Sequence, residues 1–134
     1  MSRHIQHAGL RLNRWSSFSP AQQILMIANE MNRAKKLFAL LDIGGLKLCY
    51  ERILYLTDLT IQSTLDRAST CQGSNSQRGL RKELLRWRDL VAEEYLLLST
   101  DNLMGSPDIT RHIKIFKSLL LLSHESAKQI PYLM

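Results

Sequence analysis

Two long amphipathic segments separated by a very short break constrain this chain more than any other feature. They occupy residues 19–66, with the break at Asp42-Ile43-Gly44-Gly45. Ser19 can cap a free N–H group at the start of the first segment, Gln22 can complete a capping box, and Pro20 has no N–H to leave unpaired. Apolar residues recur every three or four positions in both segments, which indicates one buried face on each helix. The sequence therefore predicts an antiparallel helical hairpin, with the aspartate and the two glycines ending the first helix.

The rest of the chain continues this pattern without a strand signal. A polar stretch at residues 69–77 is typical of a loop, and two further segments carry apolar residues at helical spacing. Four amphipathic segments with short connections are what an antiparallel bundle requires. We therefore predict an all-α fold, an up-down-up-down four-helix bundle in residues 19–134 preceded by a short arm in residues 1–18. Its helices are expected at 20–41, 45–69, 77–99 and 107–129.

The four apolar stripes also predict which side chains fill the core. Each helix contributes three of them, with successive members three to eight residues apart. The expected core residues are Ile24, Met31, Phe38, Tyr50, Ile53, Ile61, Leu84, Trp87, Val91, Ile113, Phe116 and Leu120.

The arm differs in charge from the body of the chain. It contains three arginines and no acid, which supplies half of the formal net charge of +6. We expect it to dock on the bundle through Trp15 and Phe18. The alternative is a basic arm that contacts phosphate or an acidic partner.

Composition indicates a globular protein of ordinary type. Hydrophobic residues make up 45% of the 134 residues and charged residues 22%, and the two cysteines are too few for a disulfide framework. The first residues have no apolar leader, and no apolar run approaches the ~20 residues of a membrane span. We therefore expect a cytoplasmic protein that does not enter a membrane.

The sequence contains no recognisable catalytic or metal-binding pattern. Di-metal helical bundles use Glu-x-x-His pairs, and the chain has none, because His124 and Glu125 are adjacent. The other histidines lack a carboxylate or cysteine at ligand spacing, and no phosphate-binding loop is present. We expect a protein that is not an enzyme and that takes no metal, cofactor or small-molecule substrate.

Surplus apolar residues favour a binding function instead. Leu119 to Leu122 are apolar on all sides of the last helix, and the second helix carries apolar residues away from its main stripe. Cover by the N-terminal arm is one explanation for the last helix. The other is a protein partner or self-association, as in an adaptor, chaperone or assembly subunit. The hypothetical partner surface comprises Leu48, Tyr55, Leu59, Leu119, Leu121 and Leu122.

The third helix has its charges in an unfavourable order. Five bases and one acid precede three acids, which opposes the helix dipole by a few tenths of a kcal/mol per charge. Compensating salt pairs along the helix are one explanation. The other is an anion site at the helix start, which makes a sequence-nonspecific nucleic-acid-binding subunit the alternative function. The residues of this hypothesis are Arg78, Arg81, Lys82, Arg86 and Arg88, with Arg3, Arg11 and Arg14 of the arm.

Short motifs in residues 19–66 resemble the flagellin-export chaperone family. They are Ser19-Pro20 followed by Ile24-Leu25-Met26, the Asp42-Ile43 break, and Ser63-Thr64-Leu65-Asp66 at the end of the second helix. The Tyr-Asp-Gly of that family is Ala28-Asn29-Glu30 here. The resemblance implies a four-helix bundle that binds a helical segment of an export substrate, and it assigns no role to an individual residue.

Overall fold

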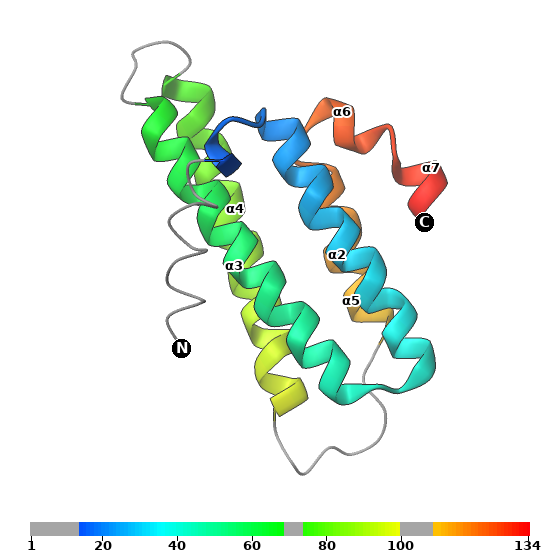
Figure 1. The fold of residues 1–134 in the computed structure, drawn as a ribbon. Coiled ribbons are helices and arrows are strands. Elements are labelled where there is room, and N and C mark those ends of the chain that lie inside the picture. Colours follow the sequence, from blue (N-terminus) through cyan, green and yellow to red (C-terminus); the bar gives the residue numbers. More distant parts are fainter. Residues whose placement is uncertain (1–13, 69–73, 100–108) are drawn as a thin grey trace.

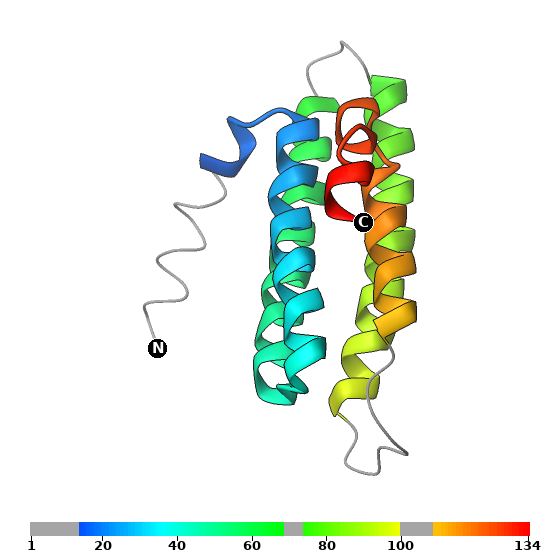
Figure 2. The ribbon, with the colours of Figure 1, turned by 90° about the vertical axis from the view of Figure 1, so that its right-hand side faces the viewer.

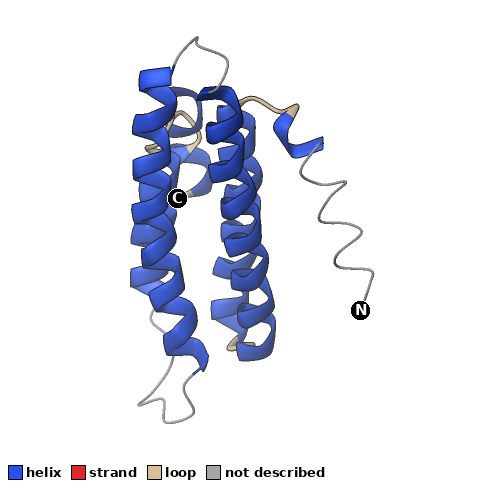
Figure 3. Ribbon diagram, turned by 90° about the vertical axis from the view of Figure 1, so that its left-hand side faces the viewer, coloured by secondary structure: helices blue, strands red, loops and turns tan. Residues whose placement is uncertain are grey.

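The computed structural model describes residues 14–68, 74–99 and 109–134. Within these ranges the secondary structure is helical and contains no strand, which confirms the predicted all-α class (Figure 3). After a helical turn at residues 14–16 come four long helices. These are α2 (Pro20–Leu40), α3 (Ile43–Ala68), α4 (Ser74–Ser99) and α5 (Ile109–Leu120), followed by the short helices α6 (His124–Ala127) and α7 (Ile130–Leu133).

The long helices pack side by side. Helix α3 contacts α2 and α4, and α5 contacts α2 and α4 from the other side (Figures 1 and 2). Paired side chains show that α3 and α4 run in opposite directions, because Arg88 bonds Asp58 while Tyr95, further along α4, bonds Glu51, earlier in α3. Short α6 lies against α2. In the described parts of the chain, no helix combines the length and apolar character that a membrane span requires.

The start of α2 confirms the expected capping box. The backbone N–H of Gln22 donates to Ser19 Oγ at 3.2 Å, and the backbone N–H of Ser19 donates to Gln22 Oε1 at 2.9 Å. Pro20 is the first helical residue and has no N–H, so the first turn contains one fewer N–H group without a partner. No helical hydrogen bond is lost, because an N–H at this position would have no partner within the helix. A local sequence signal thus fixes where this helix begins.

The turn between α2 and α3 corrects the expected role of the glycines. Helix α2 ends at Leu40 and is capped by Leu41, which adopts the left-handed conformation with φ 54°. Gly44 and Gly45 instead lie in the first turn of α3, where the N–H of Gly45 donates to Asp42 Oδ1 at 2.9 Å. A Cβ at Gly45 would approach Asp42 Oδ2 to 2.6 Å, so this glycine is needed for the aspartate to cap the helix.

Most of the predicted core residues are buried. Ten of the twelve have less than a tenth of their surface exposed, whereas Ile61 is half-buried and Ile113 is exposed. The error at Ile113 is one of register, because His112 occupies the buried position next to it. The buried predicted residues are Ile24, Met31, Phe38, Tyr50, Ile53, Leu84, Trp87, Val91, Phe116 and Leu120.

The predicted helix at 107–129 is wrong in its C-terminal half. Helix α5 ends at Leu120, and Ser123 adopts an extended conformation that caps α6 by accepting from the N–H of Ser126 at 3.1 Å. Ser126 Oγ also donates to the Leu120 carbonyl at 2.6 Å, which satisfies a free acceptor at the end of α5. The remaining boundaries differ from prediction by a few residues: α3 begins at Ile43, and α4 begins at Ser74.

The described part of the arm, residues 14–18, docks on the bundle through Trp15. Trp15 is buried, its Nε1–H donates to Thr60 Oγ1 at 2.9 Å, and its carbonyl accepts from Gln23 Nε2 at 2.7 Å. Half-buried Phe18 lies edge-on to the Trp15 ring, with ring centroids 6.1 Å apart. The predicted docking through these two aromatic residues is confirmed. Trp15 contacts α2 and α3, and the end of α5 is covered by the segment that contains α6 and α7.

Candidate functional site

The predicted apolar partner surface is divided by the structure into surface and core. Leu48 and Leu121 are exposed at 62% and 60%, and Tyr55 and Leu122 are half-buried. Leu59 and Leu119 are buried, so the proposal that they face a partner was wrong. For Leu119 the reason is the register of α5, which turns this residue inward together with Leu120.

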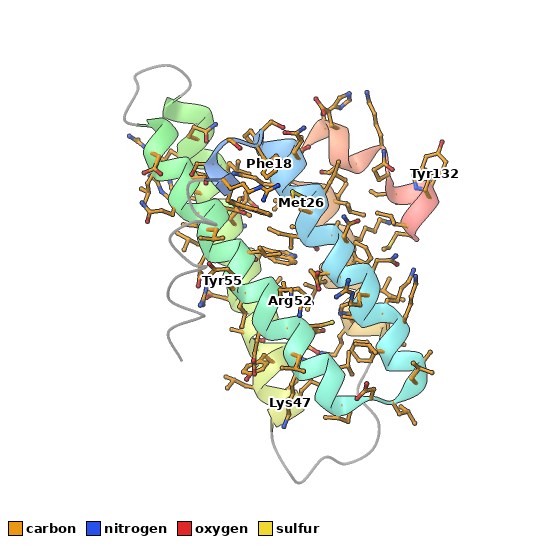
Figure 4. All side chains as sticks on the ribbon, in the orientation of Figure 1. Phe18, Met26, Lys47, Arg52, Tyr55 and Tyr132 are labelled. Atoms are coloured by element: carbon orange, nitrogen blue, oxygen red, sulfur yellow. The ribbon has the colours of Figure 1, made fainter. Side chains whose placement is uncertain are left out.

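A different group of exposed leucines gathers at one end of the helices. We call it the end patch. The α2–α3 turn and the last turn of α4 lie at the same end of the molecule (Figure 1). Figure 4 places Lys47, the neighbour of Leu48, at this end, and the bond from Tyr95 to Glu51 aligns the last turns of α4 with the first turns of α3. The patch comprises Leu40, Leu41, Leu48, Leu96 and Leu97, all of them exposed.

Leu41 is the most unusual member of the end patch. Its backbone has φ 54° and ψ 36°, a conformation that costs a side chain other than glycine about 1–2 kcal/mol. The helix end is otherwise well formed, since the N–H of Leu41 donates to the Phe38 carbonyl and that of Asp42 to the Leu37 carbonyl. Glycine usually fills this place, yet the chain holds a leucine there with 59% of its surface exposed. Sequence reasoning missed it because the apolar pattern placed Leu41 on the buried face.

The predicted anion site keeps three of its five α4 bases available. Arg86 pairs with Glu83 at 3.7 Å, and Arg88 pairs with Asp58, a hydrogen bond that raises the pKa of Arg88. Among the described residues, Arg78, Arg81 and Lys82 have no ion pair. One guanidinium nitrogen of half-buried Arg81 is fully covered and lacks a hydrogen-bond partner.

The arm residues of the same hypothesis are only partly described. Arg14 is exposed at the start of the described chain. Arg3 and Arg11 lie outside the described residues. Residues 69–73, part of the predicted loop before α4, also lie outside them.

Among the described residues one histidine, His112, is buried, and it belongs to a closed polar cluster. His112 Nε2 lies 2.9 Å from the Met31 carbonyl, which can only accept, so this nitrogen carries the proton. Nδ1 then accepts from the Tyr50 hydroxyl at 2.7 Å. The rings of Phe38 and Phe116 lie against the imidazole, with centroids 5.0 and 6.2 Å away.

The environment of this cluster stabilises its neutral form. The pKa of His112 is lowered from 6.5 to about 4, mainly by burial. The hydrogen bond to the Met31 carbonyl raises this pKa, and the nearby positive charge of Lys35 lowers it. Burial likewise raises the pKa of the Tyr50 hydroxyl. Both side chains are essentially inaccessible to solvent, so the cluster joins α2, α3 and α5 and presents no group to a substrate.

The described parts of the chain also contain no group of three or more side chains arranged to hold a metal ion. Comparison of the sequence with protein-family models, with curated proteins and with solved structures gave no match.

Proposed function

We propose that this chain is a non-enzymatic protein-binding module, an adaptor, chaperone or assembly subunit, built as an up-down-up-down four-helix bundle. The observation that carries the proposal is Leu41, an exposed leucine in a conformation that favours glycine. Strain of this kind persists where the surrounding structure enforces it, and it is concentrated at functional positions. The end patch is the surface that it points to.

Several features of the end patch support a contact with protein. Leu40 and Leu41 lie at the end of α2, Leu48 lies in the second turn of α3, and Leu96 and Leu97 add apolar surface from α4. Burying one such side chain against a partner contributes about 1.5–3 kcal/mol before the costs of association. The resemblance to flagellin-export chaperones agrees with this class of function, because those bundles bind a helical segment of another protein.

Replacing Leu41 by glycine relieves the backbone strain at this position and also removes the exposed leucine side chain. The free energy of unfolding of this variant is expected to be about 1 kcal/mol higher than that of the wild-type chain. Glycine adopts φ 54° without strain, and little buried surface is lost because the leucine side chain is mostly exposed. The same variant is expected to lose partner binding or self-association through the end patch. Chemical denaturation measures the first effect, and light scattering with pull-down from nuclease-treated lysate measures the second.

Two further variants control this experiment. Leu48→Ser removes apolar surface from the patch without relieving strain, so it should weaken association and leave stability nearly unchanged. Leu121→Ser changes an equally exposed leucine just after the end of α5, away from the patch, and should change neither association nor stability. A strict monomer that retains no protein partner, or association unchanged in Leu41→Gly and Leu48→Ser, would count against the proposal.

A nucleic-acid-binding subunit is the second candidate, favoured by the unpaired bases at the start of α4. Phosphate contacts by Arg78, Arg81 and Lys82 would carry no sequence preference and would depend steeply on salt. We expect labelled single- and double-stranded oligonucleotides to bind at low salt, and the Arg78/Arg81/Lys82→Ala variant to flatten the salt dependence. The matched control is Lys114/Lys117/Lys128→Ala, which removes the same charge elsewhere. Absence of binding at low salt, or equal loss in both variants, would end this candidate.

A further inference from the structure

The positive charge of the described chain is concentrated on two neighbouring helices. Helix α5 has three bases and no acid, and α2 has three bases and one acid. Helix α3 has equal numbers of each, and the five bases of α4 are offset by four acids. The α2–α5 side is therefore clearly more basic than the α3–α4 side, a distribution that sequence reasoning did not identify because it compared segments in chain order.

Two side chains of α5 fix how this helix is turned. Arg111 pairs with Glu94 of α4 at 3.0 Å, and His112 points into the core. At 100° per residue, Ile113 lies on the side of α5 opposite to Arg111, which is the side toward α2. Ile109 lies one turn earlier on this side and Lys117 one turn later. Ile109 and Ile113 are both more than a third exposed.

The C-terminal segment shows which side of α2 adjoins this surface. Lys35 Nζ donates to the Leu133 carbonyl of α7 at 2.7 Å, so Lys35 faces α7. In Figure 2, α6 and α7 lie over one half of α2 and α5, while no described helix lies in front of the halves nearer the α2–α3 turn. We call this second area the α2–α5 face. It comprises Lys36, Ala39, Ile109, Ile113, Lys114 and Lys117, all exposed.

Helix α7 already shows how a helical segment packs beside this face. Its Ile130 and Leu133, three residues apart, pack against the core, and Lys35 bonds the carbonyl near its end. The neighbouring α2–α5 face likewise combines apolar side chains with lysines: Ile109 and Ile113 are flanked by lysines of both helices.

We propose that the α2–α5 face binds an acidic amphipathic helix of a partner protein. Apolar residues of that helix, spaced three and four apart, would cover Ile109 and Ile113, and its flanking carboxylates would meet the lysines. The isoleucines favour a protein ligand over single-stranded nucleic acid, which is held mainly by stacking on aromatic side chains. This inference does not depend on the end patch.

The probe is a labelled synthetic peptide of about 18 residues, roughly five helical turns, with leucines on one face and glutamates on the others. Fluorescence anisotropy with the full chain measures its dissociation constant at low and at physiological salt. Lys114→Glu/Lys117→Glu is expected to weaken binding about tenfold or more, equivalent to about 1.4 kcal/mol. Arg78→Glu/Lys82→Glu makes the same change of charge on α4 and should have less than about a threefold effect.

Further arms distinguish other ligands of a basic surface. A peptide with lysines in place of the glutamates is expected not to bind, whereas an oligonucleotide and vesicles of anionic lipid should bind more weakly than the acidic peptide. Equal losses in the two charge-reversal variants would overturn the proposal, as would preferred binding of the oligonucleotide or the vesicles. Loss of peptide binding in Leu41→Gly instead of Lys114→Glu/Lys117→Glu would place the contact on the end patch and overturn it as well.

Discussion

Replacement of Phe116 by alanine is expected to lower the free energy of unfolding by about 3–5 kcal/mol. Phe116 is fully buried, and its ring contacts the cluster formed by His112 and Tyr50. Removing the ring leaves a cavity. The surrounding helices can close it only in part, because the hydrogen bonds of His112 join α2, α3 and α5 beside it. A loss of this size is a large share of the 5–15 kcal/mol that stabilises a typical domain.

The matched control is Leu121→Ala, five residues further along the chain and 60% exposed. It should change stability by no more than about 0.5 kcal/mol, because it removes little buried surface. Urea unfolding followed by circular dichroism measures both variants. A loss below about 1 kcal/mol in Phe116→Ala would contradict the packing described around α5.

Acid is expected to destabilise the fold through His112. Burial holds the pKa of this imidazole at about 4 in the folded chain, below its ordinary 6.5, so between these values the unfolded chain binds the extra proton. The contribution of neutral His112 is therefore fully present above pH 6.5 and is lost as the pH falls toward 4. The difference between the two pKa values corresponds to about 3 kcal/mol at most.

A double variant isolates this contribution from that of the carboxylates, which also titrate at low pH. Tyr50→Phe/His112→Leu removes both members of the hydrogen bond together, so neither is left buried without its partner. We expect the fall in unfolding free energy between pH 6.5 and 4 to be smaller in this variant than in the wild-type chain. Equal pH dependence of the two proteins would show that His112 is not the source.

Local signals allowed much of the fold to be predicted. The capping box of Ser19 and Gln22 fixes where α2 begins, and the regular apolar spacing of α2 identifies its buried face. Both depend on residues within a few positions of each other, so no knowledge of the partner helices was needed.

The register of α5 could not be predicted in this way. An apolar pattern favours Ile113 as the inward residue, since burying histidine is costly unless both ring nitrogens are satisfied. His112 is nevertheless inside, because Tyr50 of α3 and the Met31 carbonyl of α2 bond its two nitrogens. These groups are far away in sequence, and this single change moves Leu119 from the predicted surface to the core.

The candidate surfaces were predicted only in part for a related reason. Leu48 and the unpaired bases of α4 were identified, but Leu40 and Leu41 were not. The apolar spacing favoured a buried Leu41, whereas its left-handed conformation at the end of α2 leaves it exposed. The basic α2–α5 face exists only once two helices distant in sequence lie side by side.

The most direct test of a protein-binding function is a quantitative pull-down from nuclease-treated lysate, with the wild-type chain and Leu41→Gly compared in parallel. The proposal predicts proteins retained by the wild-type chain and depleted with Leu41→Gly, although this variant is at least as stable. No specifically retained protein, or the same proteins in equal amounts with both chains, would contradict it.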